Sequence, residues 1–87
     1  MQNNTVAYCY RVRNYEQYLH DVGELRALGY SVDDWWNALI IKENPKFNVL
    51  YLHIDLVHHT VELYDHFAGT LIVPNLEYII NKLPVVK

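Results

Sequence analysis

Two alternating apolar runs, close together in the second half of the chain, constrain its fold more than any other feature. The first runs from Val49 to Val57 and the second from Thr60 to His66. In each run an apolar side chain occupies every second position, and this period of two is typical of a strand with one buried face. The apolar positions that define the buried face are Leu50, Leu52, Ile54, Leu56, Val61 and Leu63. The two runs therefore predict an antiparallel hairpin at the centre of the domain.

The residues between the two runs predict the pairing of this hairpin. With His58 and His59 as a two-residue loop, the apolar faces of the two strands coincide. The pairs expected to face each other are Ile54 with Leu63, Leu56 with Val61, His53 with Tyr64, Tyr51 with His66 and Asp55 with Glu62. A longer loop is the alternative, because tight hairpin turns favour glycine or asparagine over histidine.

The first half of the chain predicts one strand and one helix. Alternating tyrosines and valines from Thr5 to Arg13 indicate a strand. Asn14 then has the features of a helix N-cap, with Gln17 at the capping-box position and Gly29 as a left-handed stop. The residues expected on the buried stripe of this helix are Tyr15, Tyr18, Leu19, Val22, Leu25 and Leu28.

Tyr30 to Asn37 allows two interpretations. Ser31 and Asp34 could cap a short helical turn that carries both tryptophans, or the segment could lead into a strand. We favour a strand that begins at Asn37 or Ala38 and ends at Glu43, followed by a turn at 44–47. Further on, 70–73 predicts a short edge strand, and Pro74 and Asn75 open a second helix that Pro84 ends.

These elements predict a single α+β domain over residues 1–87. The expected order is β-α-β-β-β-(β)-α, an antiparallel sheet of three to five strands with two helices on one side. Cys9 is the only cysteine, so no internal disulfide can form, and we expect a reducing compartment such as the cytoplasm. No apolar run has the length of a membrane span, and no signal peptide is recognised.

Charge and aromatic residues point to a protein partner. From residue 16 to residue 34 there are five acids and one base, a net charge of −4 within a chain whose net charge is −3. Adjacent tryptophans cannot both face one core on a regular backbone, so one of them should be exposed, and exposed aromatic residues often anchor interfaces. The expected partner-binding residues are Glu16, Asp21, Glu24, Asp33, Asp34, Trp35 and Trp36.

Other chemistries have less support in the sequence. His53, Asp55, Glu62 and His66 on the polar face of the hairpin are weak candidates for a metal site, without zinc-type spacing. Cys9 is a candidate nucleophile with no histidine near it in sequence, and no catalytic motif or cofactor signature is present. An alternative is that the chain is a small regulator that binds nucleic acid through Arg11, Arg13 and the tyrosines, but the excess of acids argues against it.

Three segments together resemble small phage-encoded accessory proteins. They are the opening strand V-A-Y-C-Y-R-V, the helix Y-E-Q-Y-L-H-D-V-G-E-L-R-A-L followed by G-Y, and the hairpin V-L-Y-L-H-I-D-L with T-V-E-L-Y. Some proteins of this group are anti-CRISPR or other anti-defence inhibitors. The resemblance implies a non-enzymatic module that inhibits a host nuclease or defence complex, in the cytoplasm of the host cell if a phage encodes the chain. A homodimer is compatible with this function, because an aromatic-rich sheet edge favours pairing.

Overall fold

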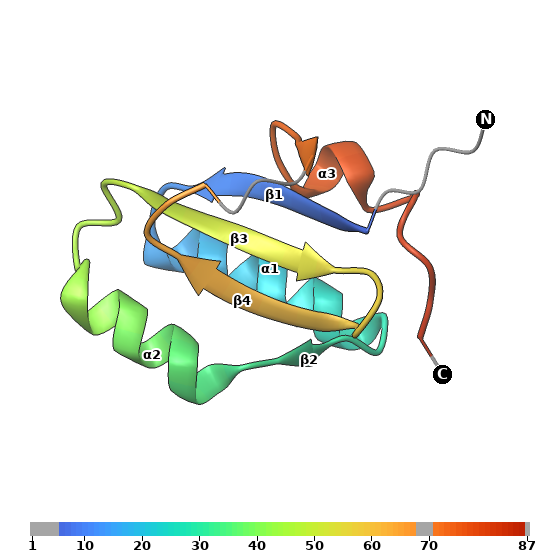
Figure 1. Cartoon of the computed structure of the whole chain (residues 1–87), viewed down its shortest axis with the longest axis horizontal. Coiled ribbons are helices and arrows are strands. Elements are labelled where there is room, and N and C mark those ends of the chain that lie inside the picture. Colours follow the sequence, from blue (N-terminus) through green and yellow to red (C-terminus); the bar gives the residue numbers. More distant parts are fainter. Residues whose placement is uncertain (1–5, 68–70, 87) are drawn as a thin grey trace.

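The structure, a computed structural model, describes residues 6–67 and 71–86. In this part of the chain five strands and three helices follow one another, and α1 crosses one face of the sheet (Figure 1). The bounds are Ala7–Val12 for β1, Tyr15–Ala27 for α1, Ser31–Val32 for β2, Asp34–Glu43 for α2, Leu50–Asp55 for β3, Thr60–Tyr64 for β4, Leu71–Ile72 for β5 and Leu76–Ile79 for α3.

The five strands form one mixed sheet in the order β2-β4-β3-β1-β5. Strand β3 is antiparallel to β1 and β4, whereas β2 is parallel to β4 and β5 is parallel to β1. The predicted α+β class is therefore confirmed. The predicted antiparallel sheet with two helices is wrong, because both edge strands pair in parallel and a third helix is present among the described residues.

The central hairpin has the predicted faces but a different register. Ile54 pairs with Val61 and Leu52 with Leu63, a shift of two residues from the predicted pairing. The shift is even, so the apolar faces still coincide. The loop has four residues, 56–59, and the Asp55 side chain accepts the backbone N–H groups of the two in its middle, Val57 and His58. The turn also places His59 at a positive φ of 60°.

Helix α1 begins and ends where the sequence predicts. The Asn14 side chain accepts the Gln17 backbone N–H, and the Gln17 side chain accepts the Arg13 backbone N–H, which together form a capping arrangement. Gly29 ends the helix at a φ of 98°, where a Cβ atom would lie 2.2 Å from the carbonyl oxygen of Val86. A side chain at this position is excluded both by conformation and by contact with the C-terminal segment.

The predicted strand from Ala38 to Glu43 is wrong: the segment is helix α2. Asp33 is its N-cap and accepts the backbone N–H of Trp36. An apolar run of this length does not distinguish a buried helix from a strand by periodicity alone. The alternative of a helical turn carrying the tryptophans is closer to the structure, but the cap is Asp33 and the helix continues for ten residues.

Side chains of α2 complete the edge of β4 where the two-residue strand β2 ends. The Asn37 carboxamide oxygen accepts the Leu63 N–H at 2.7 Å, and the Trp36 indole N–H donates to the Leu63 carbonyl at 2.7 Å. The Asn37 amide also donates to the hydroxyl of Tyr18 on α1 at 3.1 Å. Asn37 is fully buried, so these bonds fix α2 against both the sheet and α1.

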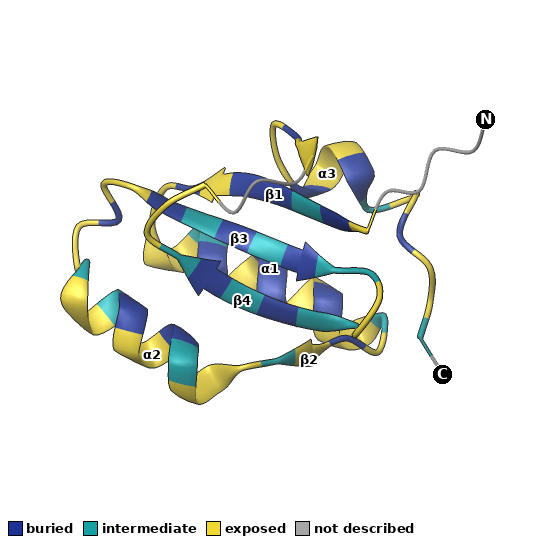
Figure 2. Cartoon of the chain, viewed as in Figure 1, coloured by how far each residue is buried: buried dark blue, intermediate teal, exposed yellow. Residues whose placement is uncertain are grey.

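The C-terminal elements partly match the prediction. Strand β5 lies within the predicted 70–73 segment, although residue 70 is outside the described residues. Asn75 caps α3 by accepting the Tyr78 N–H, but the helix ends at Ile79, before Pro84. The buried faces of the sheet, α1 and α3 form one apolar core (Figure 2). No helix among the described residues is long and apolar enough to cross a membrane.

Candidate functional site

The two tryptophans at the start of α2 have different environments. The ring of Trp36 packs against that of Tyr64, with a centroid distance of 6.3 Å, and its N–H is bonded to β4. Trp35 is 76% exposed, the most exposed of the large apolar side chains in the described residues. Leu39, one turn further along α2, is also exposed. The expected division between the two residues is observed, and Trp35 is the exposed one.

A groove of about 590 Å³ lies between α1 and α2, next to this exposed face. The two helices are antiparallel, because Arg26 near the end of α1 forms an ion pair with Asp34 at the start of α2. At the opposite end of the groove the rings of Tyr15 and Phe47 are in contact, at 6.3 Å. The groove is lined by Tyr15, Tyr18, Leu19, Val22, Arg26, Asp34, Ala38, Ile41, Lys42, Pro45 and Phe47.

This groove was missed from the sequence because two of its lining residues were predicted to be buried. Tyr15 and Leu19 are 51% and 49% exposed, so they lie on the rim of α1 and not in the core. The helical spacing of Ala38 and Ile41 on the opposite wall is recognisable only once residues 34–43 are known to form a helix.

The predicted acidic surface is divided by the structure. Glu16 and Glu24 are exposed on α1, as predicted, but Asp21 is only 5% exposed. Asp33 caps α2 and Asp34 is paired with Arg26, although both remain exposed. The five acids therefore do not form one continuous exposed stripe.

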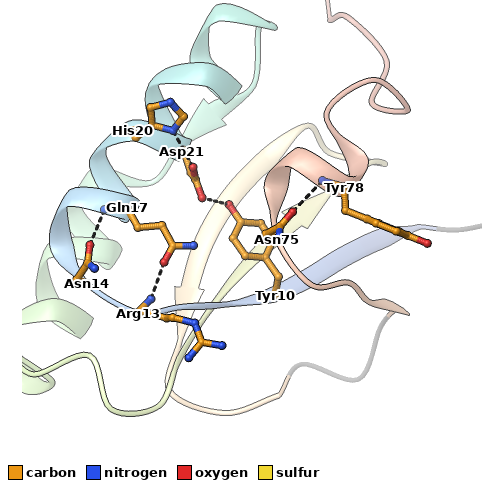
Figure 3. Close-up of polar contacts among 8 residues, drawn as sticks. All are labelled: Tyr10, Arg13, Asn14, Gln17, His20, Asp21, Asn75 and Tyr78. Atoms are coloured by element: carbon orange, nitrogen blue, oxygen red, sulfur yellow. Dashed lines mark hydrogen bonds and ion pairs between the residues drawn. The ribbon is translucent and has the colours of Figure 1, made fainter.

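Asp21 was predicted to lie on the exposed side of α1, but it lies on the buried side. Its carboxyl group accepts the hydroxyl of Tyr10 on β1 at 2.6 Å, and its second oxygen lies 3.0 Å from Nδ1 of His20 (Figure 3). Burial raises the pKa of the Tyr10 hydroxyl well above its ordinary value, and the Asp21 hydrogen bond adds to the effect. The hydrogen bond to Asp21 also raises the pKa of exposed His20. Asp21 thus joins α1 to the sheet and is not available to a partner.

The structure does not bring together the four weak candidates for a metal site on the open face of the sheet. In the observed register Asp55 faces Thr60, so the predicted opposition of Asp55 and Glu62 is wrong, and His53 faces Glu62. Asp55 is engaged by its own loop, while His66 lies beside Asp65 after β4 has ended. Among residues 6–67 and 71–86 no three His, Cys, Asp or Glu side chains come together in a way that could hold a metal ion.

Hydrogen bonds alter the acidity of two groups on this face. Burial pushes the pKa of Asp55 up, but hydrogen bonds from His58 and Val57 outweigh it and lower the pKa to about 2. Burial raises the pKa of Tyr64 to about 12, assisted by the hydrogen bond that its hydroxyl donates to Glu62. The hydrogen bonds of Asp55 hold the loop of the hairpin, and that of Tyr64 joins two side chains of β4.

The structure places a histidine beside Cys9, which the sequence did not show. Cys9 on β1 is the direct neighbour of His53 on β3. Cys9 is nevertheless completely buried, so a substrate cannot reach its sulfur in this conformation. Burial without access is typical of a packing residue.

The arginines of the alternative nucleic-acid hypothesis are both exposed. Arg11 donates to the backbone carbonyl of Asn48, and the backbone N–H of Arg13 belongs to the cap of α1. Neither makes an ion pair with another described residue, and the nucleic-acid alternative stays a prediction.

The two edges of the sheet differ in accessibility. Strand β2 pairs with Thr60 and Val61 of β4, and the side chains of Asn37 and Trp36 bond the backbone of Leu63 further along the same edge. At the other edge, Leu71 and Ile72 of β5 are both exposed. The possible homodimer stays a prediction.

Comparisons of the chain with protein-family models, curated proteins and solved structures found no match. The resemblance to small phage-encoded anti-defence proteins therefore stays a prediction from the sequence.

Proposed function

We propose that this chain is a protein-binding module without a catalytic function of its own, and that Trp35 is the centre of its binding face. The observation that carries the proposal is the exposure of Trp35 on α2. The side chains of Asn37 and Trp36 hold this helix to β4 by hydrogen bonds. Tryptophan contributes more binding energy at interfaces than most residues, and a fixed helix loses little entropy on binding.

A nuclease or other effector of a host defence system is the partner class that we propose to test first. Glu16 and Glu24 are exposed on α1, and Asp33 is exposed at the N-cap of α2. Exposed carboxylates would speed association with a basic, nucleic-acid-binding surface. Their number is small and they are spread over the surface, so these acids add long-range attraction to a basic partner and do not mimic a nucleic acid.

The proposal is tested by capture of the tagged protein's partner from a cytoplasmic bacterial extract that contains candidate defence complexes. Three forms are compared: the wild type, Trp35→Ala and Tyr78→Ala. Tyr78 is a matched control, because it is an exposed aromatic residue, 57% accessible, on a different helix. The expected result is one stoichiometric partner that is retained by Tyr78→Ala and lost, by about tenfold or more, with Trp35→Ala.

Two further arms separate the alternatives. Reversal of Glu16 and Glu24 to lysine should slow association and make it less sensitive to salt, without abolishing it. Treatment with nuclease removes proteins that are carried over by nucleic acid. Equal capture by wild type and Trp35→Ala contradicts the proposal, as does the loss of all bound proteins after nuclease treatment.

A further inference from the structure

The groove between α1 and α2 defines the kind of segment that the partner would present. We infer that it receives an amphipathic helix of the partner, with apolar side chains in the groove and an acidic residue next to Lys42. This inference rests on the proposed function and deepens it, because it specifies what lies beside Trp35 in the complex.

The walls of the groove favour a helix over an extended chain. Both walls are helices, and Tyr15, Leu19 and Val22 on α1 follow the spacing by which helical ridges pack into one another. An extended segment is held mainly by backbone hydrogen bonds to an exposed sheet edge. No strand is among the lining residues of this groove, so the backbone groups that such a segment needs are absent there.

The length of the groove fits a short helix. It extends along α1 from Tyr15 to Arg26, and the eleven steps between these residues, at about 1.5 Å each, give about 16 Å or three turns. The ring contact of Tyr15 with Phe47 bounds one end, and the Arg26–Asp34 ion pair bounds the other. A helix of three turns places three apolar side chains on one face, at i, i+4 and i+7.

The surface around the groove favours a macromolecule over a small ligand. The apolar surface does not end at the groove, because Ala38 on its wall is one helical turn from exposed Trp35 and adjacent to exposed Leu39. A small molecule in the groove would leave these side chains in water. A helix that rests in the groove can bury Trp35 under the adjoining part of the partner.

The charges of the groove specify the polar residue of the incoming helix. Arg26 and Asp34 neutralise each other, whereas Lys42 forms no ion pair with the described residues. Lys42 lines the groove and is exposed, so the groove has one uncompensated positive charge on its wall. A glutamate or aspartate beside the apolar stripe of the partner helix complements it.

The test uses a display library of helical peptides, about 16 residues long, in which one face is randomised, with the purified full-length protein as bait. The expected peptides carry apolar residues at i, i+4 and i+7 and an acidic residue beside them. A selected peptide should bind Ala38→Glu at least about tenfold more weakly than wild type, by fluorescence anisotropy. Ala38 is exposed, so this variant should keep the wild-type melting temperature, which is measured in parallel.

A charge exchange tests the assigned pair directly. Lys42→Glu should weaken the binding of the selected peptide. Replacement of the peptide's acidic residue by lysine should then restore its affinity for the Lys42→Glu variant. Selection of no helical pattern, or binding that Ala38→Glu leaves unchanged, overturns the inference. If Trp35→Ala abolishes capture of the natural partner while Ala38→Glu does not, the protein-binding function stands and the helix-in-groove inference fails.

Discussion

Replacement of Asn37 by alanine tests how α2 is attached to the domain. The substitution removes two hydrogen bonds, one from the Leu63 N–H and one to the Tyr18 hydroxyl. Asn37 is fully buried, so water cannot take its place without rearrangement, and the Leu63 N–H is left without an acceptor. An unsatisfied buried donor costs about 1 to 3 kcal/mol, and the second hydrogen bond adds about 1 kcal/mol. We therefore expect a loss of about 2 to 4 kcal/mol in the free energy of unfolding.

This loss is large for a chain of 87 residues, whose total stability should be about 5 to 10 kcal/mol. The assay is equilibrium urea denaturation with circular dichroism, supported by the melting temperature, which should fall by at least about 8 °C. Asn48→Ala is the matched control, because Asn48 is an exposed asparagine whose backbone carbonyl is retained. A change of less than about 0.5 kcal/mol for Asn37→Ala, similar to a neutral surface substitution, would refute the reasoning.

Three further predictions concern the fold. Gly23→Ala should stabilise α1 by up to about 1 kcal/mol, since nothing lies within 4 Å of the added Cβ, while Gly29→Ala should strongly destabilise the protein. Melting temperatures of the two variants that shift in the same direction would contradict this. Tyr10→Phe should cost about 1 to 3 kcal/mol in urea denaturation, because it removes the donor to the buried Asp21 carboxyl group; an unchanged denaturation midpoint would argue against that role. The lowered pKa of Asp55 stabilises the folded state above pH 3.8, and this contribution should be lost as the pH falls towards about 2; an NMR titration that gives an ordinary pKa near 3.8 would exclude the proposed loop hydrogen bonds.

The elements that were predicted correctly have signals that depend on neighbouring residues alone. Asn14 and Gln17 contain the whole capping interaction, and Gly29 is required by the local backbone conformation. The alternating strands of the hairpin also specify their own buried face. The strand register was missed because it depends on hydrogen bonds from a four-residue loop to Asp55, which no periodicity reveals.

The parts that were missed depend on contacts between distant segments. Residues 34–43 are apolar enough for either a helix or a strand, and the choice depends on how Asn37 satisfies the edge of β4, 26 residues away. Asp21 lies between Tyr18 and Leu25 at helical spacing, so its position on the buried stripe was available from the sequence. A carboxyl group there was assigned to solvent because its partner, Tyr10, belongs to another element.

The candidate site was predictable only in part. The adjacency of Trp35 and Trp36 correctly required that their environments differ, but which of them is exposed depends on the contact of Trp36 with β4. The groove beside them lies between two helices. It could not be predicted, because one of these helices was predicted to be a strand.

Fluorine NMR of the protein labelled with 5-fluorotryptophan tests the central claim most directly. The chain has two tryptophans, so two resonances are expected, and Trp35→Phe assigns them. On addition of the dominant protein recovered in the capture experiment, the Trp35 resonance should shift or broaden and lose its sensitivity to a paramagnetic solvent probe, whereas Trp36, packed on Tyr64, should change less. A Trp35 resonance that remains unchanged and fully accessible at saturating partner would contradict the account.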